Sequence, residues 1–156
     1  MGNALHLPAK NGNIQSFQKV IEDNPKIDPC QKNKNGNTPL HKASQYGHIE
    51  IIKELASMGV DVNITNRDGY TPLHLAAMKG QKEAAAELIL LGADKDKEGG
   101  VWGSSPLHWA CIHSHIDTIK LLIEKGANTT LKDGVGKTPL CFIKDEALRA
   151  ELVSCC

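Results

Sequence analysis

The sequence of 156 residues predicts an all-α fold in which pairs of helices stack into one elongated domain. Two observations carry this prediction. A short motif with proline and leucine returns at a nearly constant spacing, and each copy is followed by apolar patterns of helical period. From the period we expect ten helices or nearly so, paired within five units of a gently curved rod, with little or no β-sheet.

The repeated motif is Thr or Ser followed by Pro, Leu and His. Its copies begin, at spacings of 33, 34 and 33 residues, at Thr38, Thr71, Ser105 and Thr138. In the last copy, Cys141 replaces the histidine. A fainter copy, Ala4-Leu5-His6, lies 35 residues before Pro39-Leu40-His41. A period in this range is typical of an array of small units, each of which buries its apolar face against its neighbours.

Each unit opens with a polar turn that contains glycine, for example Asp68-Gly69-Tyr70, because glycine adopts backbone angles that other residues resist. Thr or Ser then serves as the N-cap of a first helix, and Pro follows at the first helical position, where its missing N–H costs nothing. The histidine three residues after the cap is placed to hydrogen-bond back to the hydroxyl, as in a capping box. The leucine points inward, and small residues such as Ala76-Ala77 let neighbouring helices approach closely.

A Gly-His pair, as in Gly47-His48, ends the first helix and opens the second. The second helix carries apolar residues at helical spacing, namely Ile49, Ile52, Leu55 and Ala56 in one copy. Glycine then ends this helix as a C-terminal cap at Gly59, Gly92 and Gly126.

Two positions depart from the pattern and predict local changes. Pro8 falls inside the first helix of the N-terminal copy, so we expect that helix to be shortened, with its start near Pro8, or to be distorted there. Ser114 takes the place of the helix-break glycines Gly47 and Gly80. If the backbone at Ser114 is left-handed, replacement by glycine should stabilise the fold.

The T-P-L-H tetrapeptide, the Gly-His break and the Gly-Ala-Asp or Gly-Ala-Asn segment after the second helix resemble the ankyrin repeat family across nearly the whole chain. The resemblance implies an ankyrin-repeat solenoid of helix-turn-helix units with hairpin-like turns that project to one side. It also implies a concave face, made by those turns and the first helices, which ankyrin proteins generally use to bind proteins. We divide the single domain 1–156 into a capping copy at about 1–33, full repeats at about 34–66, 67–99 and 100–132, and a second capping copy at about 133–156.

The composition argues against several other classes of protein. Lys plus Arg and Asp plus Glu each number 18, so no net charge draws the chain to nucleic acid or to an anionic membrane. Apolar residues make up 40%, but no run reaches the length of a membrane span, and no secretory signal is visible. The five cysteines are an odd number, which favours free thiols in the cytoplasm, with the nucleus as a second compartment.

Three kinds of chemistry are considered and set aside. The segment 134–138 ends like a phosphate-binding loop, but Leu131 stands where that loop needs glycine. Cys111, His113, His115 and Cys141 could be drawn as metal ligands, yet His115 occupies the helix-break position and Cys111 that of a small core residue. Four of the seven histidines share one repeated position, which favours a structural role, so we expect no enzyme activity, cofactor or metal.

Both ends carry weak resemblances to lipidation signals. Gly2 stands at the myristoylation position, but His6 occupies the place where Ser or Thr is expected. The chain stops at Cys155-Cys156, which is similar to some geranylgeranylated termini although it lacks the usual four-residue form. Two spare thiols after the last helix are the simpler interpretation.

Turn tips and the exposed side of each first helix are not constrained by stacking, so we expect their residues to bind the partner. In the same register in three copies these positions hold Lys34, Asn35, Asn37, Gln45 and Tyr46, then Arg67, Asp68, Tyr70, Met78 and Lys79, then Val101, Trp102, Ser104, Ile112 and His113. Exposed Tyr, Trp and Arg are enriched at interface hot spots. We expect Tyr46, Tyr70, Met78, Trp102 and Ile112 to form one apolar stripe, flanked by cations, whereas Trp109 packs against an adjacent helix.

Two functions fit this sequence. In the first, the chain is an intracellular adaptor or inhibitor, monomeric by itself, that binds one protein through its concave face. In the second, it is a targeting or scaffold module of a larger or lipid-anchored protein whose activity lies elsewhere.

Overall fold

The computed structural model describes residues 4–154, which form nine α-helices and one 3₁₀ helix. In chain order these are α1 (His6–Asn11), α2 (Ile14–Asp23), α3 (Pro39–Tyr46), α4 (Ile49–Ser57), α5 (Pro72–Met78), α6 (Lys82–Leu90), α7 (Pro106–Ile112), α8 (Ile116–Glu124), η1 (Pro139–Phe142) and α9 (Glu146–Ser154). Within this part of the chain the only β-type pairing is an isolated bridge between Gly99 and Ser104. The predicted all-α solenoid with ten helical segments is therefore confirmed.

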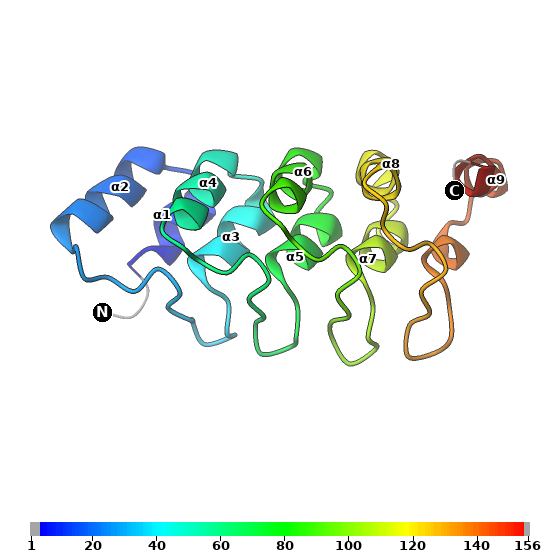
Figure 1. The fold of residues 1–156 in the computed structure, drawn as a ribbon, viewed down its shortest axis with the longest axis horizontal. Coiled ribbons are helices and arrows are strands. Elements are labelled where there is room, and N and C mark those ends of the chain that lie inside the picture. The colour runs from blue at the N-terminus through cyan, green and yellow to red at the C-terminus, as the bar shows by residue number, and fades with distance from the viewer. Residues whose placement is uncertain (1–3, 155–156) are drawn as a thin grey trace.

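The helices form two rows that run along the stack (Figure 1). One row holds the first helices α1, α3, α5 and α7, followed by η1, and the other holds α2, α4, α6, α8 and α9. Each first helix contacts the first helix of the next unit as well as the second helix of its own. The hairpin turns all project from the side of the first helices, so equivalent turn residues line up along the molecule (Figure 1).

The N-terminus of each first helix in the middle of the stack is fixed by the predicted capping box. The hydroxyl oxygens of Thr38, Thr71 and Ser105 lie 2.8–2.9 Å from Nδ1 of His41, His74 and His108, respectively. The other ring nitrogen of each histidine, Nε2, lies 2.9–3.0 Å from a backbone carbonyl oxygen of the following hairpin turn. Each histidine therefore ties a helix to its own cap and one unit to the next.

The core is a continuous strip between the two rows of helices. It consists of the motif leucines Leu40, Leu73 and Leu107, the small residues that follow them, and the inward residues of the second helices. Cys111 is fully buried there, as expected for a small core residue. Because small residues separate neighbouring first helices, the units pack closely enough for Nε2 of each motif histidine to reach a carbonyl oxygen of the next unit.

The structure confirms the local prediction for Pro8 and meets the condition on which the prediction for Ser114 depends. Helix α1 begins at His6, two positions after Ala4, which is the equivalent of Pro39 in this copy. Pro8 therefore lies in the first turn of α1, where no helical N–H bond is lost. Ser114 adopts a φ of 57° and is the only residue other than glycine with a positive φ among residues 4–154.

Thr138 occupies the predicted N-cap position, before η1, but the expected side-chain cap hydrogen bond is missing. Thr138 forms no cap hydrogen bond to the backbone, and its hydroxyl lies 3.2 Å from Sγ of Cys141. From Pro139 to the start of α9 at Glu146 the chain has seven steps, whereas Pro39 to Ile49 is ten. With three residues fewer, the first helix of this unit closes as the single 3₁₀ turn η1, and Ile143 is already extended.

Candidate partner-binding surface

The predicted partner-binding residues lie on the turns and first helices, on the side toward which the turns project. Most of them are exposed, namely Lys34, Asn35, Tyr46, Arg67, Asp68, Lys79, Val101, Trp102, Ile112 and His113. Tyr70 and Met78 are only partly exposed. The large apolar side chains of highest exposure in this set, Val101 at 91% and Trp102 at 56%, belong to the same turn.

Two turn positions that we expected to be unconstrained are buried by the stacking. The carbonyl oxygen of Asn37 lies 2.8 Å from Nε2 of His6, and its side-chain oxygen accepts a hydrogen bond from Asn66. The carbonyl oxygen of Ser104 lies 3.0 Å from Nε2 of His74. The backbone carbonyl at this register position faces the preceding unit, whose histidine reaches across to it. The side chains of Asn37 and Ser104 are buried there and are not available to a partner.

A cavity of about 390 Å³ opens where the last two turns meet the ends of α7 and η1. Its lining is mostly apolar and aromatic and consists of Trp102, Ser104, Trp109, Ile112, Asp133, Val135 and Phe142. The two turns that form it are joined by a hydrogen bond of 2.6 Å from the amide of Gly134 to the carbonyl oxygen of Trp102. This hydrogen bond fixes the two turns relative to each other. Apolar side chains of the cavity such as Trp102 are open to solvent.

Trp109 packs against neighbouring aromatic rings and also lines the cavity. Its ring meets the edge of Tyr70 at a centroid distance of 5.6 Å and stacks on His113 at 5.9 Å, and the same ring lines the cavity. Trp109 is partly buried by these contacts, and it also contributes to the cavity lining. Its indole nitrogen is buried and has no hydrogen-bond partner.

The polar groups around the cavity are mostly engaged by the protein itself. The carboxylate of Asp133 accepts hydrogen bonds from the amides of Val135 and Lys137, which hold the last turn. The ammonium group of Lys137 lies 5.4 Å from the ring centre of Phe142. Beside Trp109, burial and then the nearby His115 and Lys79 side chains lower the pKa of His113.

Sequence reasoning missed Trp109, Val135 and Phe142 as members of this surface. The signal was present in the register: Trp109 and Phe142 follow the fourth residue of the motif in successive copies, 33 residues apart, and Val135 matches Trp102. In the earlier copies the position of Trp109 holds Lys42 and Leu75, which hides the aromatic pair from a reading of one copy at a time.

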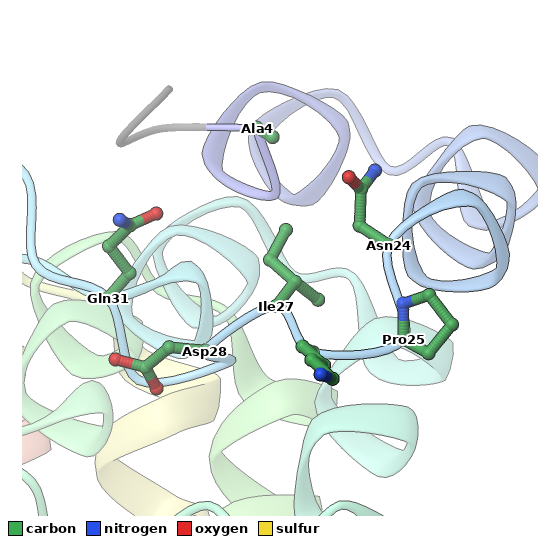
Figure 2. A pocket seen from close by; sticks show the side chains of 7 residues that line it. Ala4, Asn24, Pro25, Ile27, Asp28 and Gln31 are labelled. Carbon is green, nitrogen blue, oxygen red and sulfur yellow. The ribbon is translucent and has the colours of Figure 1, made fainter.

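A second, larger cavity of about 780 Å³ lies at the N-terminal end of the stack, between the start of α1 and the loop after α2 (Figure 2). Its lining is Ala4, Asn24, Pro25, Lys26, Ile27, Asp28 and Gln31. Figure 2 shows Ile27 in the middle of a largely polar border. None of the predicted partner-binding residues lines it, and it contains no aromatic side chain that could serve as an anchor.

His115 and Cys111, two of the candidate metal ligands, are engaged in the packing of the stack. Nε2 of His115 lies 3.0 Å from the carbonyl oxygen of Met78, and burial raises the pKa of the Cys111 thiol to about 12. No three His, Cys, Asp or Glu side chains within residues 4–154 gather in a way that could hold a metal ion.

The same part of the chain has no helix that is both long and apolar enough to cross a membrane. Gly2, Cys155 and Cys156 lie outside the described residues.

The two rows of helices, the aligned turns and the open apolar surface define a helical repeat protein of the kind that binds other proteins. The sequence matches the family described as Ankyrin repeats (3 copies) over residues 5–99 and 87–143. The chain belongs to the ankyrin repeat family, and it is a module for protein–protein interaction.

Several ankyrin-repeat relatives are much longer than this chain. It is 38% identical over 135 residues to palmitoyltransferase ZDHHC13 of Homo sapiens, which covers 86% of this chain and 20% of that protein. It is 39% identical over 137 residues to ankyrin repeat and SOCS box protein 3 of Homo sapiens, which covers 87% and 26%. A third match, to ankyrin repeat and SOCS box protein 11 of Danio rerio, is 33% identical over 112 residues and covers 72% and 38%. The chain thus spans about a fifth of the length of its palmitoyltransferase relatives.

Proposed function

We propose that this chain binds a partner protein through the concave side of its stack and that it has no catalytic activity of its own. The cavity between the last two turns is the main anchoring point, and the stripe formed by Tyr46, Tyr70 and Met78 extends the contact toward the N-terminus. The observation that carries the proposal is the open apolar lining of this cavity, since Trp102 and Ile112 are 56% and 38% exposed.

The energetic argument is the burial of this apolar surface. Removal of apolar area from water contributes about 25 cal/mol per Å². Large aromatic side chains in a shaped cavity are the usual hot spots of interfaces, and rigid surroundings reduce the entropy lost on binding. The hydrogen bond between Gly134 and Trp102 and the contacts of Trp109 with Tyr70 and His113 provide such surroundings.

The role of the chain is that of an adaptor or inhibitor in the cytoplasm. A second candidate role, a targeting or scaffold module that works within a larger protein, is favoured by the length of the relatives. In the palmitoyltransferase and SOCS-box relatives, a repeat region similar to this chain occupies about a fifth to a quarter of the protein.

The test is a binding measurement on two matched variants. A partner identified by crosslinking in cells would be titrated by calorimetry into the unchanged chain, Trp102→Ala and Leu90→Ala. Leu90 is the control because it is an apolar side chain, 80% exposed, on the second-helix row. We expect Trp102→Ala to weaken binding by about 2 kcal/mol or more.

Leu90→Ala should leave the affinity unchanged, and neither variant should alter thermal unfolding much, because both side chains are exposed. A partner whose affinity falls with Leu90→Ala and not with Trp102→Ala would place binding on the second-helix row and contradict the proposal.

A further inference from the structure

We propose that the partner segment bound on the concave side is an acidic stretch of polypeptide with an apolar anchor residue. This inference rests on the proposed function and names the chemistry of its partner. It follows from how charge is distributed over a chain whose net charge is zero.

The turns and first helices carry a net positive charge, which the rest of the chain balances with an equal net negative charge. We define the concave strip as residues 4–11, 33–46, 66–79, 99–113 and 133–142, which are the first helical segments with their hairpin turns. This strip contains six Lys and Arg residues and two Asp, and the rest of the chain contains twelve Lys and Arg and sixteen Asp and Glu. The strip therefore carries a net charge of +4 and the remainder −4.

The cations of the strip form none of the ion pairs found within residues 4–154, although Arg67 donates a hydrogen bond to the carbonyl oxygen of Lys34 and Lys42 donates one to the side chain of Gln45. All four ion pairs within the described residues involve the second helices or their ends: Lys53–Glu87, Lys120–Glu151, Lys125–Glu124 and Arg149–Glu146. Of the two carboxylates in the strip, Asp133 is buried and holds the amides of its own turn. The other carboxylate of the strip, Asp68, is exposed. Glu98 is a further exposed carboxylate, directly before the segment 99–113 of the strip.

The cations also lie beside the apolar anchor points. Lys137 lies over the ring of Phe142 in the main cavity, at 5.4 Å from its centre, and Lys10 lies 5.8 Å from the ring centre of Tyr46. Lys79 lies near enough to His113 to contribute to the lowering of its pKa, and the ring of His113 stacks on Trp109. A partner whose apolar side chain enters the cavity would place its neighbouring residues within reach of these positive groups, where carboxylates are favoured and ammonium groups are not.

An acidic polypeptide fits this surface better than a nucleic acid does. Six cations in four of the five units give a weak field compared with the dense phosphate charge of a nucleic acid, whose binding normally requires a strongly basic face. The apolar cavity between the last turns needs a side chain to fill it. Binding to RNA is therefore an outcome of the test that would overturn the proposal.

The experiment is a selection of short random peptides on the immobilised chain, followed by affinity measurements. We expect the selected peptides to combine an apolar residue with several Asp or Glu and to bind more weakly as the salt concentration rises. Lys79→Glu and Lys137→Glu should each weaken a selected peptide by up to about fivefold. Lys82→Glu, an equal charge reversal at the exposed start of α6, should leave the affinity within about twofold.

The outcomes separate this inference from the proposed function. Selected peptides without acidic residues that still require Trp102 would overturn the charge inference and leave the concave site in place. Peptides that are acidic but indifferent to Trp102→Ala would overturn the proposed site. Equal losses from Lys82→Glu and Lys79→Glu, or tighter binding of a single-stranded RNA probe than of the acidic peptides, would also overturn the charge inference.

Discussion

Single side chains tie the units of this stack together, and the motif histidine does so at both of its ring nitrogens. His41 and His74 are fully buried, with one nitrogen at the helix cap and the other at the next turn. Burial, which is the largest influence, lowers the pKa of each from 6.5 to about 4. The native stack thus holds these two rings neutral at a pH where an exposed histidine begins to take up a proton.

This lowering predicts a stability that depends on pH. Since the unfolded histidines keep a pKa of 6.5, the unfolded chain binds protons first as the pH falls. The stabilisation is therefore complete above pH 6.5 and is lost as the pH falls toward 4, by about 2 kcal/mol per histidine at pH 5. Urea denaturation at several pH values checks this, and a flat free energy of unfolding between pH 6.5 and 5 would contradict it.

Ser114 gives a second prediction at the scale of one residue. A left-handed backbone costs a residue with a Cβ atom about 1–2 kcal/mol, and glycine avoids that cost but has more freedom to lose on folding. We expect Ser114→Gly to raise the free energy of unfolding by about 0.5–1 kcal/mol. Ser114→Ala, which keeps the Cβ atom, is the control and should show no gain; equal stabilisation by both would mean that strain at φ 57° is not the cause.

Among the elements, the last pair departs most from the repeat. The turn η1 replaces a full first helix, and α9 lies at one end of the stack, with a second helix, α8, on one side. Its contacts include the buried Leu152, the partly buried Leu148 and the ion pair of Glu151 with Lys120, whose two side chains are largely exposed. Such a pair adds little stability.

Hydrogen exchange should reflect this difference. We expect the amides of η1 and α9 to exchange fastest among the helices, and those of α3, α5 and α7, which have neighbours on both sides, to exchange slowest. Peptide-level mass spectrometry resolves these segments. Protection of α9 equal to that of α5 would show that the whole stack opens as one unit.

Over the whole molecule, stability depends on contacts between neighbours, because each unit buries its apolar face only against the next. Leu73 lies at the centre of the stack and is fully buried, whereas Leu140 belongs to the last unit and is 8% exposed. The same substitution should therefore have different costs at these two positions.

We expect Leu73→Ala to lower the free energy of unfolding by about 3–5 kcal/mol and Leu140→Ala by about 1–2 kcal/mol. Denaturant unfolding followed by circular dichroism measures both. The reverse order, with the larger loss at Leu140, would mean that the C-terminal unit controls the stability of the stack.

The fold, the order of its elements and most of their ends can be predicted from the sequence. Helix caps, glycine turns and a period of 33 residues are local signals, so the capping boxes and the shortened α1 could all be predicted. The 3₁₀ turn η1 could not be predicted from the motif alone, because the motif is intact up to Leu140 and the loss of three residues comes after it.

Which side chains share a surface depends on the packing of the units against one another. This packing buried Asn37 and Ser104, which the sequence pattern left exposed, and joined Trp102 to Trp109 and Phe142 around one cavity. The physical reason is that a repeat motif specifies what each unit does within itself. Contacts across units depend on how far the stacking brings one turn toward the next, and that distance is set by the packing of the helices behind them.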